Sequence, residues 1–176
     1  MTLVTPVLGV SARRQSIDVL NDSYIPSNTP PGSNTWPSAN LAIYVPLRVV
    51  SRVVVKQLWL AATATGTGNA DCGVYNSGGT RLVSAGSTAR VAAVAEQVFD
   101  VTDTTIGPGL YYWALSCSNN TDQVKSLVPV APLPAAWGVL SEALGSVTLP
   151  ATATWVVDQT LALIPVGGIL LETVTT

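Results

Sequence analysis

Residues 72–84 read Cys-Gly-Val-Tyr-Asn-Ser-Gly-Gly-Thr-Arg-Leu-Val-Ser and give the clearest local signal in the chain. Two short runs with valine, tyrosine and leucine flank the sequence Asn76-Ser77-Gly78-Gly79. Gly78 and Gly79 can adopt, at little steric cost, the positive φ angles that tight hairpin turns require. The stretch therefore predicts an antiparallel β-hairpin.

Strand-like segments continue on both sides of this hairpin. Valine and threonine are abundant and glutamate and lysine are scarce, which favours pleated sheet because β-branched side chains lose rotamer freedom in helices. Glycine or proline interrupts nearly every ten residues, a spacing typical of β-sandwiches. We therefore expect an all-β antiparallel sandwich, with strands at 16–20, 41–45, 48–62, 96–102, 110–117, 154–164 and 169–174, the last two separated by Gly167-Gly168.

Alternation within these strands predicts the core. In segment 48–62, Val53, Val55 and Trp59 share one face and Arg52, Val54 and Lys56 share the other. In segment 110–117, the same rule directs Tyr111, Trp113, Leu115 and Cys117 inward.

The flanking segments do not follow the strand pattern. Residues 1–40 are rich in proline, serine, asparagine and threonine and predict an extended arm. Residues 41–176 form the expected single domain, with an irregular, proline-rich insertion at about 122–153 and a helical turn or two within 135–144. No fixed-period repeat is visible, which argues against a solenoid or propeller.

Composition excludes several classes of function. The chain has 176 residues, 48% apolar and only 10% charged, where soluble domains average about 25% charged. It contains no histidine, which removes Ser/His/Asp and Cys/His catalysis and imidazole zinc sites. A net charge of −2 without basic runs argues against nucleic-acid binding. The apolar tracts of the chain are too short to span a membrane. We expect no cofactor and no export signal.

Two groups of residues could carry chemistry. Cys72 and Cys117 each lie in a predicted strand. Two buried free thiols are favoured, and a disulfide between them is the alternative. Asp100 and Asp103 form the best carboxylate pair, which could serve a glycosidase or bind calcium, and Asp18 with Asn21 and Asp22 is the second cluster. Backbone hydrogen bonding in turns explains such aspartates more simply.

Aromatic and apolar residues outside the regular strands predict a protein interface instead. Trp59 and Trp113 lie in strands and are expected in the core, whereas three other tryptophans lie in irregular segments and are free to anchor a partner. The expected interface residues are Trp36, Pro37, Trp137, Val139, Leu140, Leu144 and Trp155.

Three runs of sequence together resemble a known family: residues 36–46, the 72–75 run with its Gly78-Gly79 turn, and residues 107–114. They are similar to small β-sandwich accessory proteins of tailed bacteriophage virions, over about residues 35–120. The resemblance implies a jelly-roll-like domain, preceded by an extended arm, that decorates the capsid or forms part of a fibre or tail.

These observations lead to one expected function and two alternatives. The first is a non-enzymatic virion structural protein, a homo-oligomer, possibly a trimer, that is assembled in the host cytoplasm and contacts other capsid or tail proteins. Low charge and surplus apolar residues fit a subunit whose surface is covered in an assembly. The alternatives are a carbohydrate- or receptor-binding module that takes a host glycan, and a glycosidase that uses Asp100 and Asp103.

Overall fold

A computed structural model describes residues 13–16, 32–92, 96–128 and 131–173 of the chain. This part of the protein is nearly all β, with 56% strand and 3% helix. The strands in chain order are β1 (Arg13–Ser16), β2 (Gly32–Thr35), β3 (Leu41–Val49), β4 (Val53–Ala61), β5 (Asn69–Asn76), β6 (Arg81–Ser84), β7 (Thr88–Ala89), β8 (Glu96–Ile106), β9 (Gly109–Cys117), β10 (Gln123–Leu127), β11 (Leu140–Ala143), β12 (Ile164–Pro165) and β13 (Gly167–Thr173). The helix α1 spans Leu133–Ala136.

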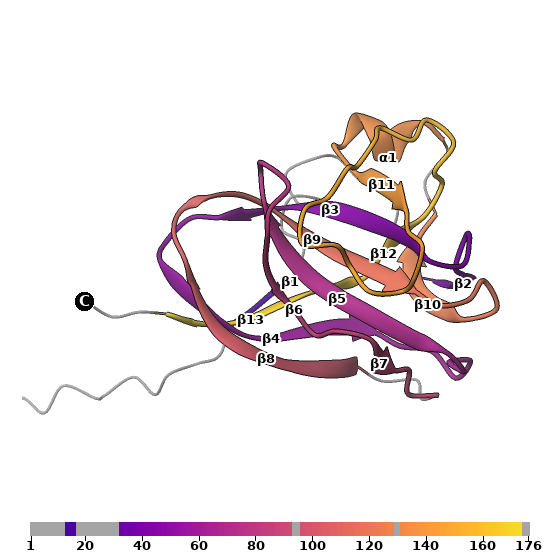
Figure 1. Ribbon diagram of the computed structural model, residues 1–176, viewed down its shortest axis with the longest axis horizontal. Helices are drawn as coiled ribbons and strands as arrows, with labels where there is room; N and C mark the ends of the chain where they lie inside the picture. Colours follow the sequence, from indigo (N-terminus) through magenta and orange to yellow (C-terminus); the bar gives the residue numbers. More distant parts are fainter. Residues whose placement is uncertain (1–12, 17–31, 93–95, 129–130, 174–176) are drawn as a thin grey trace, which may run out of the picture.

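Two antiparallel sheets form the body of the molecule (Figure 1). One has the order β1-β13-β4-β8 and the other the order β11-β3-β9-β5-β6, with β7 paired to β5. The chain passes from β3 to β4 in the opposite sheet, back to β5 and β6, across to β8, back to β9 and finally to β13. The eight strands β1, β13, β4 and β8 in one sheet and β3, β9, β5 and β6 in the other have the strand order of a jelly roll. The expected antiparallel sandwich is confirmed.

The main core lies between the two sheets. Side chains from both layers, including Ile43, Leu58, Phe99, Trp113 and Ile169, form one continuous buried cluster. The predicted inward set on β9 is confirmed, since Tyr111, Trp113, Leu115 and Cys117 all belong to or pack against this cluster.

A bulge at Lys56 changes which face of β4 is buried. The register of β4 shifts between Val55 and Gln57 against β8, and β13 shifts opposite the same place. Val53 and Val55 therefore share the core with Leu58 and Leu60. Trp59 is buried as expected, at 6% exposed, but it does not share a face with Val53, because an extra residue in one strand inverts the alternation after it.

The predicted hairpin is confirmed as β5 and β6. The amide of Gly79 donates to the carbonyl of Asn76 at 3.0 Å, and the amide of Asn76 donates to the carbonyl of Thr80 at 3.0 Å. The Asn76 side-chain oxygen accepts from the amides of Gly78 and Thr80. Gly79 has a φ of 84°, whereas Gly78 is not among the described glycines with positive φ.

The boundary of the domain differs from the expected one. Strand β2 pairs with β10 in a small third sheet, and Trp36 is only 1% exposed, so residues from Gly32 onward pack with the domain. The remaining strand of the expected arm is β1 at 13–16, whereas 17–20 lie outside the described residues.

The C-terminal elements also differ from expectation. The segment 154–163 is irregular, and Gly167-Gly168 begin β13 rather than breaking a strand pair. The helical turn lies at 133–136, earlier than expected, and residues 140–143 form β11 instead. Single-residue bridges at Thr152 and Val156 replace the ladder that alternation predicted there.

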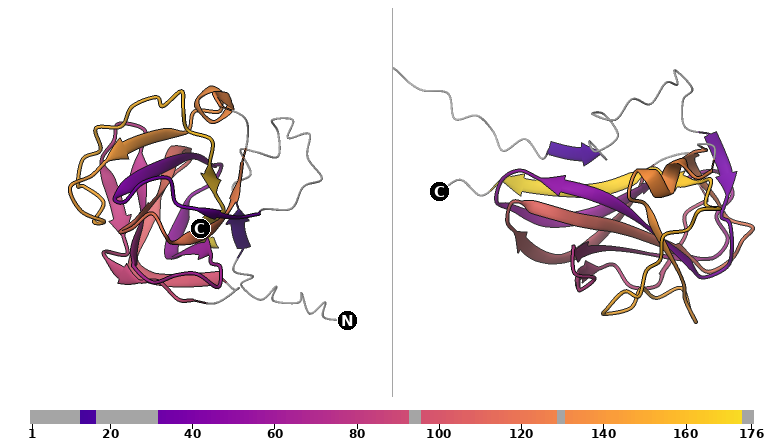
Figure 2. Two further views of the ribbon diagram at one scale, coloured as in Figure 1. Left: turned by 90° about the vertical axis from the view of Figure 1, so that its right-hand side faces the viewer. Right: turned by 90° about the horizontal axis from the view of Figure 1, so that it is seen from above.

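A segment after α1 covers the outer face of the larger sheet (Figure 2). Tyr44 and Tyr75 project from that face and are buried together with Leu149. Leu144 and Trp155 pack against this second cluster. We call residues 144–155 the covering segment. Much of the apolar surplus that the sequence places outside the strands is therefore buried within the chain.

Candidate interaction surface

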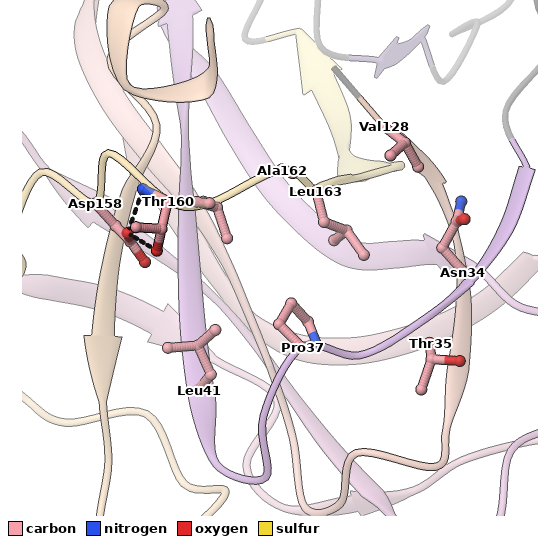
Figure 3. A pocket seen from close by; sticks show the side chains of 10 residues that line it. Asn34, Thr35, Pro37, Leu41, Val128, Asp158, Thr160, Ala162 and Leu163 are labelled. Atoms are coloured by element: carbon pink, nitrogen blue, oxygen red, sulfur yellow. Dashed lines mark hydrogen bonds between the residues drawn. The ribbon is translucent and has the colours of Figure 1, made fainter. Parts of the chain in front are cut away.

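An open hollow of about 400 Å³ lies beside the small sheet β12-β10-β2 (Figure 3). It is bounded on one side by β2 and the residues that follow it, and on the other by the irregular chain between β11 and β12. Its lining residues are Asn34, Thr35, Pro37, Leu41, Val128, Asp158, Thr160, Leu161, Ala162 and Leu163.

Three of the four polar side chains that line the hollow, those of Asn34, Asp158 and Thr160, make hydrogen bonds within the chain. The Asn34 amide nitrogen donates to the Ser126 hydroxyl at 2.9 Å. Asp158 accepts from the Thr160 hydroxyl at 2.7 Å and from the Thr160 amide at 2.8 Å. These hydrogen bonds, the hydroxyl one first, lower the pKa of the Asp158 carboxyl. The groups left to meet a partner are mainly apolar, which suits an apolar side chain better than an ion or a reacting group.

Exposed valines occur in the lining of this hollow and in the chain that leads into it. Eight large apolar side chains in the described residues are exposed, and four of them come from the segment 128–157. Val128 is 61% exposed and lines the hollow, whereas Val156 and Val157, 59% and 56% exposed, directly precede Asp158. We call Pro37, Val128, Val156 and Val157 the apolar end surface. Sequence reasoning missed the three valines because it gave weight to the tryptophans.

Two of the expected interface residues are buried in the chain. Trp36 is 1% exposed, and its indole nitrogen donates to the carbonyl of Leu41 at 3.0 Å. Val139 is 0% exposed. Neither side chain offers surface to a partner, so we remove both from the candidate interface. Pro37, next to the buried tryptophan, is exposed in the hollow.

The other four expected residues are half-buried. Trp137 packs against the main core, whereas Leu140, Leu144 and Trp155 pack against the second cluster. The Trp155 ring centroid lies 4.7 Å from that of Tyr112 and 5.2 Å from that of Tyr44. These contacts account for part of each side chain, and their role at an interface stays a prediction.

A buried carboxylate fixes the covering segment to the sheet. Asp71 on β5 is 0% exposed and accepts from the amide of Leu149 at 2.9 Å and from the Ser84 hydroxyl at 3.0 Å. Burial raises the pKa of this carboxyl, although the hydrogen bonds oppose the effect. The Arg81 guanidinium donates to the carbonyl of Leu149. A lone aspartate inside an apolar strand was the sequence signal for this role.

Two tyrosines complete the attachment. The Tyr75 hydroxyl donates to the carbonyl of Pro150 at 2.6 Å, and the Tyr44 hydroxyl donates to Glu142 at 2.8 Å. The other oxygen of Glu142 accepts from the Thr154 hydroxyl at 2.6 Å. Burial raises the pKa of Tyr44 above its usual range, and the hydrogen bond to Glu142 adds to the effect. These hydrogen bonds hold the covering segment against the outer face of the larger sheet.

The candidate chemical groups from the sequence are placed elsewhere. Cys72 and Cys117 are buried free thiols, as favoured, and burial raises the pKa of Cys117 to about 12. Asp100 accepts from the Gln57 amide at 2.8 Å, and Asp103 pairs with Lys56, all near the surface of the four-stranded sheet. The cluster at Asp18, Asn21 and Asp22 lies outside the described residues.

The described part of the chain shows no metal centre, since nowhere in it do three histidine, cysteine or acidic side chains gather to hold an ion. No described helix has the length and hydropathy needed to cross a membrane. Comparison with protein-family models, with curated proteins and with solved structures finds no match for this chain.

Proposed function

We propose that the protein is a non-enzymatic structural subunit of a tailed-bacteriophage virion, either a capsid decoration or a fibre-type protein. It acts by assembling with copies of itself and with other capsid or tail proteins. The observation that carries this proposal is the apolar end surface, in which exposed Val128 lines the hollow and exposed Val156 and Val157 directly precede its lining residue Asp158.

The chemistry of that surface suits association rather than catalysis. Fully burying one exposed valine on a partner contributes at most about 1.5–3 kcal/mol, so these three side chains offset part of the free-energy cost of association. The carboxylate next to this surface, Asp158, accepts hydrogen bonds from the hydroxyl and the amide of Thr160. Jelly rolls occur in viral capsid proteins and in lectins, which is compatible with the proposal but does not choose between them.

Particle composition tests this function. Virions whose genome carries this sequence would be purified, washed in high salt and analysed by quantitative mass spectrometry and by gold-labelled antibodies against the chain. We expect a fixed number of copies per particle, with the label confined to the capsid or to the tail. Washed particles that lack the chain would overturn the proposal.

A glycan-binding module is the second candidate, favoured by one observation. Tyr112 and Trp155 are half-buried rings whose centroids lie 4.7 Å apart on the outer face of the larger sheet, beside the buried Tyr44. Aromatic rings of this kind can stack on sugars. A glycan array with the wild-type chain and the Trp155→Ala variant decides the matter, because a lectin signal should be saccharide-dependent and lost in the variant. A wild-type chain that binds no saccharide removes this candidate.

A further inference from the structure

Strand β1 is attached to the domain through one neighbour. It pairs with β13 from Arg13 opposite Leu171 to Ser16 opposite Gly168, and it lies at the end of the sheet order β1-β13-β4-β8. Figure 2 shows it alongside the yellow β13. Its sequence, Arg-Arg-Gln-Ser, has no apolar side chain to add to the core. The backbone ladder to β13 is therefore its main described attachment.

Strand β13 does not need β1 to keep its place. It pairs with β4 through seven residues, from Gly167 opposite Leu60 to Thr173 opposite Val53. Ile169 and Leu171 are buried in the main core. Without β1, β13 would still be fixed on one side and would present its other side as an edge with unpaired backbone groups, which readily accept another strand.

The connection between β1 and β2 is longer than a within-domain connection requires. Residues 17–31 separate Ser16 from Gly32, fifteen residues where about 4–6 are usual. Fully extended, a chain of that length reaches about 50 Å. The length therefore permits β1 to pair with β13 of its own chain or of a neighbouring chain.

The balance between these two pairings is set by concentration. The ladder is the same in both cases, because identical strands pair in an identical register. A tether of about fifteen residues holds β1 near its own β13 at an effective concentration on the order of millimolar. Neighbouring copies in an ordered assembly reach comparable local concentrations. Pairing of β1 with the β13 of a neighbour therefore has nearly the same free energy there as pairing within one chain.

We propose that the edge of β13 that β1 covers within one chain accepts β1 from a second copy of this chain, so that assembled subunits are linked by strand exchange. This inference rests on the self-association in the proposed function and adds the element that carries it. It commits to β1 as occupant because the edge and the strand already match in length and register within one chain.

Paired cysteines distinguish the two arrangements. Arg14 lies opposite Leu170, which is half-buried, and antiparallel partners about 4.5–5.5 Å apart fall within the range for a disulfide. One copy would carry Arg14→Cys and a differently tagged copy Leu170→Cys, both with Cys72→Ala and Cys117→Ala. The two would be mixed, assembled and oxidised, then separated on a non-reducing gel. Because each copy has one cysteine, a band containing both tags requires exchange.

We expect the two-tag band to be the main product in assembled fractions and at least tenfold weaker in dilute monomer. A matched double variant in one chain, Gln57→Cys with Asp100→Cys, joins β4 to β8 and should form only an intrachain bond. Assembled fractions without the two-tag band would overturn strand exchange and leave self-association standing. A chain that stays monomeric by sedimentation at every concentration would overturn both.

Discussion

Gly167 in β13 packs closely against Trp113 of the opposite sheet. A Cβ at this position would lie 2.3 Å from Cζ2 of Trp113 and 2.7 Å from the carbonyl oxygen of Trp59. Gly167→Ala is therefore expected to lower the free energy of unfolding by about 1–3 kcal/mol, because the core has no room for the methyl group. Gly145→Ala is the matched control, since nothing lies within 4 Å of its added Cβ, and urea unfolding should show a change below about 1 kcal/mol. Equal effects of the two substitutions would contradict this packing.

Asp71 is expected to make stability depend on pH. Its pKa is raised in the folded chain, so the folded state binds a proton more tightly than the unfolded state, whose carboxyl titrates near 3.9. The stabilising contribution is fully present below the unfolded pKa and is lost as the pH rises through the folded pKa. Asp71→Asn keeps an acceptor for Leu149 without this titration. The unfolding free energy of the wild type minus that of Asp71→Asn should fall as the pH rises from 4, and a difference that rises would contradict the assignment.

Among the strands, alternation in the sequence predicted some buried faces correctly, whereas tertiary contacts determined others. The hairpin of β5 and β6 and the inward set on β9 followed from glycines and period-two spacing alone. The bulge at Lys56 was invisible, because an inserted residue leaves no mark in composition, and it inverted the face assigned to Trp59. Trp36 and Val139 lie in segments without strand-like alternation, which predicted an interface role, although the fold buries both. The covering segment could not be predicted, since Asp71 and Leu149 are 78 residues apart.

The covering segment supplies a prediction at the same scale. Leu149 is 1% exposed and anchors this segment in the second cluster. Leu149→Ala should cost about 2–5 kcal/mol locally and expose the segment more often, because it removes the buried anchor. Hydrogen exchange of amides 151–156 should accelerate, with little change at 113–117 in the central strand β9. Thr148→Ala, at an exposed neighbour, serves as the control, and faster exchange in that variant would contradict the anchoring role.

At the scale of the whole molecule, the apolar surplus divides into three parts. One fills the jelly-roll core, a second is buried beneath the covering segment, and the third forms the apolar end surface. In a monomer, this third part is exposed to solvent. Five other large apolar side chains in the described residues are exposed outside that surface: Val50, Val91, Val98, Leu110 and Leu133. Val50 and Leu110 belong to the β3–β4 and β8–β9 turn regions, which Figure 1 shows at the far end from α1.

Sedimentation velocity of the full chain at micromolar concentrations tests the central claim, that the apolar end surface drives assembly. The wild type should sediment as an oligomer, whereas Val156→Asp with Val157→Asp should shift it to monomer, because two buried charges would cost several kcal/mol at the contact. Val50→Asp, at the 73% exposed valine of the opposite end, should leave the oligomer intact. A monomeric wild type, or an oligomer unchanged by the double substitution, would contradict the claim.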